Sequence, residues 1–170
     1  MGRAIADLKV TVETNAQIDD NLDLPALVVP ALRNALGDRL RSVVLFGSRA
    51  RGDHHPESDW DLLVIAELLP TRPLERYREV KSALPPGARG AVAVLATTAE
   101  EFEAHLPEIY LDIALDGQIL LDRDGYAAGR FAELRRIMDK SGLYRERTPA
   151  GDVWKWRVPP REPWSIEWER

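Results

Sequence analysis

The chain has 170 residues, 45% of them hydrophobic and 30% charged, and a formal net charge of −5 at pH 7. This length suits a single globular domain. The negative charge argues against strong nucleic-acid binding, which needs concentrated Lys and Arg. The absence of cysteine excludes disulfides and thiolate zinc sites. No apolar run reaches the roughly 18 residues that cross a bilayer, and no signal-peptide core follows the first residues. We therefore expect a cytoplasmic protein with no membrane partner.

The first predicted element is a helix behind an N-terminal leader. Residues 1–22 show no clean hydrophobic period, and we expect a loose leader or a short strand near residues 9–12. Residues 24–37 predict a helix, because apolar side chains recur three and four positions apart between Asp23 as N-cap and a glycine as C-cap. Pro30 either delays the start of this helix or kinks it.

The next segments predict the core of a sheet. Residues 41–46 and 59–65 have the apolar content of buried strands, and residues 47–58 between them predict a loop and turn. A connection this short favours an antiparallel pair. Residues 90–95 predict a third strand, and the helical crossover over residues 72–84 is long enough for parallel pairing.

Helical signals return after the third strand. Thr98 and, three residues later, Glu101 form the signature of a capping box, and helix should continue from there with a break near Pro107. Residues 119–121 predict a short edge strand. Residues 124–140 predict an amphipathic helix.

The end of the chain differs in character from the rest. Residues 142–170 carry many charges, four prolines and four of the five tryptophans, which are Trp154, Trp156, Trp164 and Trp168. Aromatic residues are depleted in disordered chains, so we expect an extended Trp/Pro-rich arm that docks on a surface. That surface is either the protein's own domain or a partner, including a second copy of the chain.

The most informative motif lies between two of the predicted strands. Gly47-Ser48 stands ten residues ahead of the pair Asp59-x-Asp61. Alternation along a strand puts both aspartates on one face, about 6.6 Å apart at about 3.3 Å per residue. Two carboxylates at this spacing can hold one or two divalent cations, and the Gly-Ser turn offers backbone N–H groups and a hydroxyl to a phosphate. The alternative is a solvated turn with two surface aspartates.

Other charged residues have an open assignment. Arg49 and Arg51 suit a triphosphate clamp, since guanidinium groups match phosphate oxygens, but a solvated loop would carry them equally well. The adjacent histidines at 54–55 either contribute to a zinc site or lie in an exposed loop. Asp112 and Asp116 are four positions apart on a predicted helix, where they either face a common cation or are surface charges.

This motif resembles the signature of the DNA polymerase β-like nucleotidyltransferase superfamily, and its Gly47–Gly52 form resembles the minimal nucleotidyltransferase branch. The resemblance covers about residues 24–122. It implies an α/β (α+β) fold of the polymerase β-like type: a small mixed β-sheet with helices on one side, followed by a C-terminal helix and the Trp/Pro-rich arm. The nucleotidyltransferase domain would then span residues 23–141, between the leader and the arm.

The resemblance also implies an activity. It is the transfer of a nucleoside monophosphate from a nucleoside triphosphate, ATP or another NTP, to an acceptor with the help of Mg²⁺. Asp59 and Asp61 would be catalytic and hold one or two Mg²⁺ ions, and the nucleotide would be bound by Gly47, Ser48, Arg49 and Arg51. Small members of this branch often pair with a helical HEPN-type protein as antitoxins, by masking or adenylylating it. About 50 residues follow the core here, too few for the helical domain that recognises small acceptors, which favours a protein acceptor.

The chain departs from the family pattern at the third carboxylate. In the family, an acid that activates the acceptor hydroxyl usually lies on the strand after the intervening helix. Here the corresponding positions hold Ala91 and Ala93. The general base would then be Asp112, Glu100 or Glu101, or a group of the acceptor itself. The remaining alternative is a reaction without a general base. The rival hypothesis is a catalytically weak or inactive module that keeps the fold and binds nucleotide, a HEPN-like partner, or both.

Overall fold

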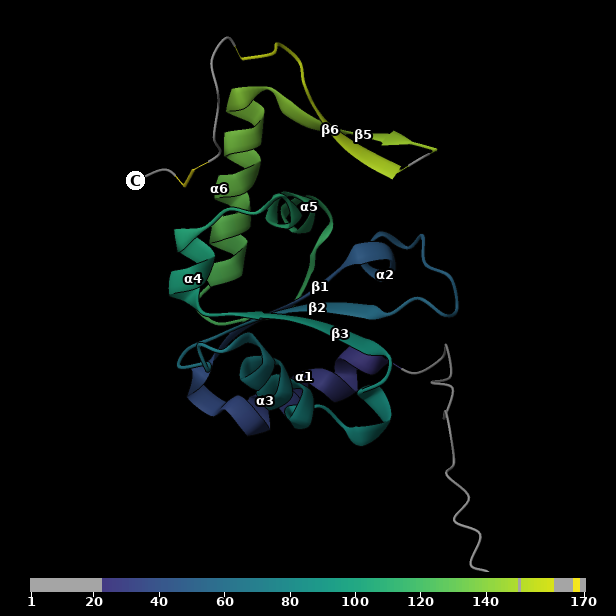
Figure 1. Ribbon diagram of the computed structural model, residues 1–170, viewed down its shortest axis with the longest axis vertical. Helices are drawn as coiled ribbons and strands as arrows, with labels where there is room; N and C mark the ends of the chain where they lie inside the picture. The colour runs from purple at the N-terminus through teal and green to yellow at the C-terminus, as the bar shows by residue number, and fades with distance from the viewer. Residues whose placement is uncertain (1–22, 150, 161–166, 169–170) are drawn as a thin grey trace, which may run out of the picture.

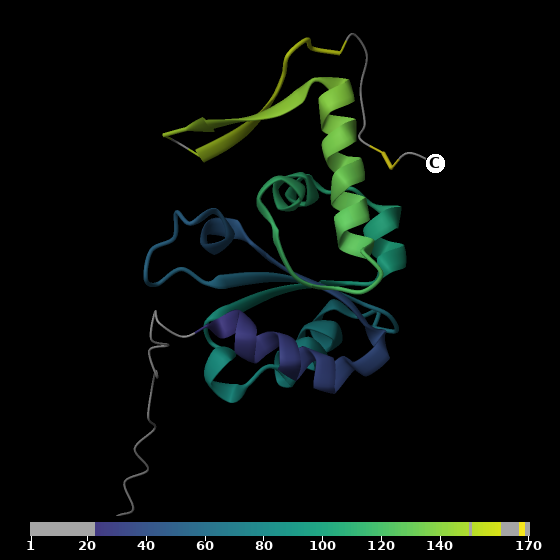
Figure 2. The same ribbon diagram turned by 180° about the vertical axis from the view of Figure 1, so that it is seen from behind.

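The computed structural model describes residues 23–149, 151–160 and 167–168. The predicted leader, with its strand near residues 9–12, and Trp164 lie outside these ranges. A four-stranded sheet runs through the middle of the molecule, with helices above and below it, and a separate two-stranded hairpin lies beyond the upper helices (Figures 1 and 2).

The helices and strands follow the predicted order, with additions. The helices are α1 (Leu24–Leu36), α2 (Gly47–Arg51), α3 (Pro73–Ala83), α4 (Ala99–Ala104), α5 (Glu108–Asp116) and α6 (Tyr126–Ser141), with short 3-10 turns at Gly37–Arg39 and Pro86–Ala88. The central strands are β1 (Leu40–Phe46), β2 (Trp60–Ala66), β3 (Val92–Thr97) and β4 (Gln118–Asp122). The hairpin consists of β5 (Leu143–Thr148) and β6 (Gly151–Trp156). Within the described ranges, no helix combines the length and apolarity needed to span a membrane.

The sheet has the mixed pairing that the sequence predicts. Its strand order is β3-β2-β1-β4, with β1 antiparallel to both β2 and β4, and β2 parallel to β3. In this register Asp61 on β2 lies between Phe46 on β1 and Ala93 on β3. Aligned residues on neighbouring strands share a face of the sheet. The position expected to carry the third carboxylate is therefore directly beside Asp61.

Helices cover both faces of the sheet, so the prediction of helices on one side is wrong. Leu62 and Val64 of β2 pack into one core with α1 and α3, whereas Leu63 and Ile65 pack into a second core with α4, α5 and α6 (Figure 1). Every residue from 62 to 65 is apolar and fully buried. A strand without polar alternation must be covered on both faces.

The first two helices show one confirmed prediction and one error. Asp23 caps α1 by accepting a hydrogen bond from the N–H of Ala26, and Pro30 lies inside the helix on its exposed side without delaying its start. Residues 47–58 are not loop throughout, because residues 47–51 form α2. Gly52, with φ of +78°, closes this short helix by donating its N–H to the carbonyl of Ser48.

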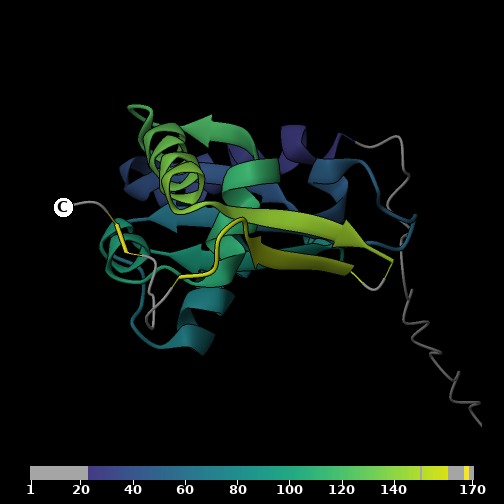
Figure 3. The ribbon, with the colours of Figure 1, turned by 90° about the horizontal axis from the view of Figure 1, so that it is seen from above.

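The arm prediction is partly wrong. Leu143–Thr148 and Gly151–Trp156 pair as the β5–β6 hairpin rather than forming an extended segment, and Figure 3 shows the hairpin leaving the end of α6 and extending over α5. Trp154, Trp156 and Trp168 pack against the core formed with α4, α5 and α6. For these three rings the docking surface is the protein's own domain. Association through the arm with a second copy stays a prediction.

An ion pair ties α3 to the start of α4. The predicted capping box is confirmed: Thr98 and Glu101 exchange backbone and side-chain hydrogen bonds. Glu101 also accepts two bonds from the guanidinium of Arg76, at 2.5 and 2.7 Å. The Arg76 side chain is 12% exposed. This pair, together with the hydrogen bond from the Thr98 N–H, holds the pKa of Glu101 at about 2, below its usual 4.5.

We expect Glu101→Gln to lower the free energy of unfolding at pH 7 by about 1–2 kcal/mol, discounted because the Glu101 side chain is 42% exposed. A lowered carboxyl pKa stabilises the fold fully above pH 4.5, and this contribution is lost as pH falls toward 2. Urea unfolding of both proteins should therefore give a difference that shrinks below pH 4.5. Glu100→Gln, an exposed position in the same helical turn, is the control and should change little. A pH-independent difference would contradict the assignment.

Candidate active site

The turn after β1 is packed against an aspartate of β2. Gly47 has φ of +73°, a conformation that L side chains rarely adopt. A Cβ atom built on Gly47 would lie 2.3 Å from Oδ2 of Asp61 and 3.1 Å from its Cγ. The turn and the carboxylate can occupy these positions together only because residue 47 is glycine.

The sheet register determines where Asp61 points. Asp61 is two residues ahead of Leu63 on β2, and Leu63 faces α4, α5 and α6, so Asp61 lies on that same face. Asp59 precedes the first residue of β2 and is exposed. The two aspartates therefore lie at the end of the sheet where β1 ends and β2 begins, and Asp61 is the one that packs against Gly47.

The electrostatics of the pair suit a cation. Burial raises the pKa of Asp61, the nearby negative charge of Asp59 raises it further, and Arg51 opposes the shift. Ionising Asp61 therefore carries a cost that a bound cation would offset. Within the described ranges, no group of three or more His, Asp or Glu residues is arranged to hold a metal. Two carboxylates fit Mg²⁺, which takes few protein ligands and completes its shell with phosphate oxygens and water.

The two arginines of α2 have different surroundings. Arg49 donates from Nε to the carbonyl of Ser58 at 2.9 Å and from Nη2 to that of Pro56 at 3.2 Å, and its guanidinium lies 4.5 Å from the centre of the Trp60 ring. It thus braces the loop that leads to Asp59. Arg51 donates to the carboxylate of Asp53 at 3.0 Å and lines a cavity.

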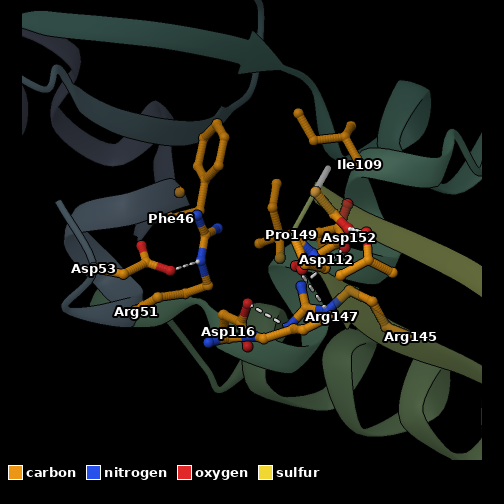
Figure 4. Close-up of a pocket in the computed structure, with 14 residues that line it drawn as sticks. Phe46, Arg51, Asp53, Ile109, Asp112, Asp116, Arg145, Arg147, Pro149 and Asp152 are labelled. Atoms are coloured by element: carbon orange, nitrogen blue, oxygen red, sulfur yellow. Dashed lines mark hydrogen bonds and ion pairs between the residues drawn. The ribbon is translucent and has the colours of Figure 1, made fainter.

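The cavity measures about 600 Å³ and opens beside Gly47, between α2, α5 and the β5–β6 hairpin (Figure 4). The charged side chains that line it are Arg51, Asp53, Asp112, Asp116, Arg145, Arg147 and Asp152. Its apolar lining is Phe46, Ile109, Ile113 and Pro149. Sequence reasoning missed this cavity, because its walls come from segments as far apart as residues 46 and 152 and no local pattern connects them.

A buried arginine fastens the hairpin to α5. The side chain of Arg145 is 8% exposed and pairs with Asp112 at 2.9 Å, Asp116 at 2.6 Å and Asp152 at 3.3 Å. Burial alone would lower the pKa of Arg145, but the hydrogen bonds and charges of Asp116 and Asp112 raise it. Asp112 and Asp116 were expected either to face a common cation or to be surface charges. In the structure they share a cation, which is the guanidinium of Arg145.

The remaining candidate residues are either exposed or paired with an arginine. The two histidines at 54–55 are exposed, as in the loop alternative. Among the candidate bases, Glu101 is paired with Arg76, Asp112 is paired with Arg145, and Glu100 is exposed. A carboxylate with a pKa of about 2, such as Glu101, is a poor general base at neutral pH.

Residues 29–114, just over half of the chain, match the family model described as nucleotidyltransferase domain. The chain therefore belongs to the nucleotidyltransferase domain family. The glycine turn, α2, both aspartates and β3 all lie inside the matched residues.

Two curated relatives come from Methanocaldococcus jannaschii, and both are named as proposed protein adenylyltransferases. One is 47% identical over 49 residues, which are 29% of this chain and 33% of that protein. The other is 53% identical over 36 residues, which are 21% of this chain and 36% of that protein. The chain thus matches only about a third of the length of each.

Solved structures with a similar backbone include a toxin–antitoxin complex with AMP-PNP. It is 17% identical, with a TM-score of 0.45, over 68% of this chain and 90% of that chain. A proposed nucleotidyltransferase from Sulfolobus solfataricus is 21% identical, with a TM-score of 0.43, over 59% of this chain and 82% of that chain.

We expect Gly47→Ala to shift the titration of Asp61. The added methyl group would push the Asp61 carboxylate out of its half-buried position, so its raised pKa should fall back toward the ordinary Asp range. The measurement is the NMR titration of the Asp61 side-chain carbon. Gly52→Ala is the matched control: it carries the same backbone strain at φ of +78°, worth about 1–2 kcal/mol, but its Cβ meets nothing within 4 Å. Equal Asp61 titration in the two variants would refute the packing argument.

Proposed function

We propose that this protein transfers a nucleoside monophosphate, AMP in the first instance, from a nucleoside triphosphate to a hydroxyl group of an acceptor protein. The observation that carries the proposal is the carboxylate of Asp61 packed against Gly47 beside Asp59, in a chain that belongs to the nucleotidyltransferase domain family. The names of the two curated relatives, protein adenylyltransferases, support AMP as the group transferred and protein as the acceptor.

In this proposal, the aspartates and the Gly47-Ser48 turn bind the nucleoside triphosphate together, the aspartates through Mg²⁺ and the turn through direct contacts with phosphates. Asp59 and Asp61 hold Mg²⁺, as one ion or two, while the backbone of Gly47 and the hydroxyl of Ser48 contact the terminal phosphates. Arg51, beside the cavity, supplies a cation to the triphosphate. Bound Mg²⁺ would neutralise the triphosphate charge and align it for in-line attack. The sequence suggested that Arg49 binds the nucleotide directly. In this proposal Arg49 instead holds the loop that leads to Asp59, through its hydrogen bond to the carbonyl of Ser58.

At the α-phosphorus, the transfer forms one bond and breaks one. The acceptor oxygen bonds to the α-phosphorus, the bond from that phosphorus to the oxygen bridging to the β-phosphate breaks, and pyrophosphate leaves. The acceptor hydroxyl must also lose its proton. Ala93, the residue aligned with Asp61 on β3, has no group to accept it. In the proposal this proton passes to water or to a group of the acceptor, and turnover is slow.

The acceptor we propose is a helical HEPN-like protein, for which this chain acts as an antitoxin. The resemblance of the Gly47–Gly52 segment to the minimal nucleotidyltransferase branch supports this pairing. We assign the transferase domain to residues 23–141 and treat residues 142–170 as an addition to it. The second candidate function is a catalytically weak or inactive module that binds nucleotide or this partner, and alanine at position 93 is the observation that favours it.

The first test is calorimetric titration of ATP with Mg²⁺. We expect Asp59→Asn and Asp61→Asn each to weaken binding at least tenfold, because the cation loses one of its two carboxylates. Binding to the unmodified chain should also strengthen as pH rises through the raised pKa of Asp61, because a metal ligand must be deprotonated. Glu57→Gln, which removes an exposed charge from the same loop, is the control. Equal affinity in all four proteins would refute the metal site.

The second test restores the missing acid. We expect Ala93→Asp to accelerate the transfer of label from α-labelled ATP to protein acceptors by about 10²–10⁴-fold, the range of general-base catalysis. Ala132→Asp adds the same charge at an exposed position on α6 and should leave the rate unchanged. If the unmodified chain already turns over as fast as Ala93→Asp, the proton has another acceptor and position 93 does not limit the reaction.

A further inference from the structure

The cavity beside Gly47 has a wall that the family match does not include. The match ends at residue 114, whereas the hairpin spans residues 143–156. The hairpin brings Arg145, Arg147 and Asp152 to a space that α2 and α5 border on the other sides (Figure 4). Asp53, in the segment after α2, and Arg147 of the hairpin line this same cavity.

The charge of the cavity is divided between its two sides. Toward α5 and the hairpin, Asp112, Asp116 and Asp152 surround Arg145, and Arg147 also lines the cavity, so three carboxylates face two guanidinium groups and one negative charge is in excess. A triphosphate would be repelled there. An uncharged group that donates hydrogen bonds would be accepted, because each carboxylate has about four acceptor sites and Arg145 uses only some of them.

The apolar part of the lining sets a second requirement. Phe46, Ile109, Ile113 and Pro149 present hydrophobic surface to the cavity. A ligand with a flat apolar face and several hydroxyl or amino donors would satisfy both sides, and the ribose and base of a nucleotide have this chemistry. A volume of about 600 Å³ lies within the usual range of small-ligand pockets.

The position of the cavity relates it to the aspartate pair. Gly47 borders the cavity, and the carboxylate of Asp61 is packed against this same residue. A molecule with its phosphates at Gly47 therefore has the cavity directly available for the part that carries no charge.

We propose that α5 and the β5–β6 hairpin form the binding subsite for the nucleoside part of the nucleotide. Asp152 accepts a hydrogen bond from a ribose hydroxyl or an exocyclic amine of the base, and Ile109 packs against the base. Arg145 is a positioning residue, which holds the hairpin against α5 and so keeps the wall in place. The inference rests on the proposed function, because it takes the triphosphate to lie at Gly47 and the aspartates.

The experiment compares two probes, ATP and inorganic tripolyphosphate, each titrated with Mg²⁺ into the chain of residues 1–170. Ile109→Trp fills part of the cavity and should weaken ATP binding at least tenfold. Asp152→Asn keeps the shape but removes a charged acceptor and should weaken it about fivefold. Neither variant should change tripolyphosphate affinity by more than about twofold. The control is Glu146→Gln, a neighbour of Arg145 on β5 that pairs with Lys155.

The pattern of outcomes separates the inference from the function on which it rests. Loss of ATP affinity with tripolyphosphate affinity kept supports the nucleoside subsite. If ATP affinity is unchanged, the cavity does not hold the nucleoside, and an acceptor side chain becomes its better occupant. Equal weakening for both probes means that the cavity acts on the phosphates and also overturns the inference. If neither probe binds the unmodified chain, the proposed function fails and the inference fails with it.

Discussion

The packing of Asp61 against Gly47 is the constraint on which the rest of the site depends. A Cβ atom at position 47 would lie 2.3 Å from Oδ2 of Asp61, so any side chain there would need the space that the Asp61 carboxylate occupies. Because β1 and β2 are antiparallel, the end of one meets the start of the other, and Phe46 lies opposite Asp61. The turn and the acid are thus brought together by the sheet register rather than by a flexible loop. The raised pKa of Asp61 follows from the same burial.

The surrounding strands and helices fix the position of the end of the sheet that carries Asp61. β2 is central, paired with strands on both sides and covered on both faces, so the position of Asp61 is fixed by two cores at once. By contrast, among the described residues the hairpin has no hydrogen-bonded strand pairing with the main sheet, and it is fastened through Arg145 and the packing of its tryptophans. An isolated two-stranded hairpin is marginally stable in water. The cavity wall therefore depends on these few contacts more than the aspartate pair does.

Most of the main sheet could be predicted from sequence because its signals are local. The apolar runs, the Asp23 cap and the Thr98–Glu101 capping box each lie within a few residues, and the structure contains all of them. The prediction that helices lie on one side of the sheet was wrong, although the sequence contains evidence against it. The unbroken apolar run at residues 62–65 indicates a strand that is covered on both faces. The cavity and the Arg145 cluster had no such signal, because Arg145 meets Asp112 and Asp116 across about thirty residues of chain. The metal and nucleotide roles of the motif residues stay predictions.

The candidate acids differ in what they can do chemically. A general base needs a free carboxylate with a pKa near the working pH. Glu101 has a pKa of about 2 and is paired with Arg76, and Asp112 is paired with Arg145, so neither meets this need. Asp61, whose pKa is raised, is the acid best suited to exchange a proton, yet it is also the one best placed to hold a cation. It cannot do both at once, because a metal ligand must stay deprotonated. With alanine at position 93, a site that uses Asp61 for the cation must therefore rely on its acceptor or on water to remove the proton.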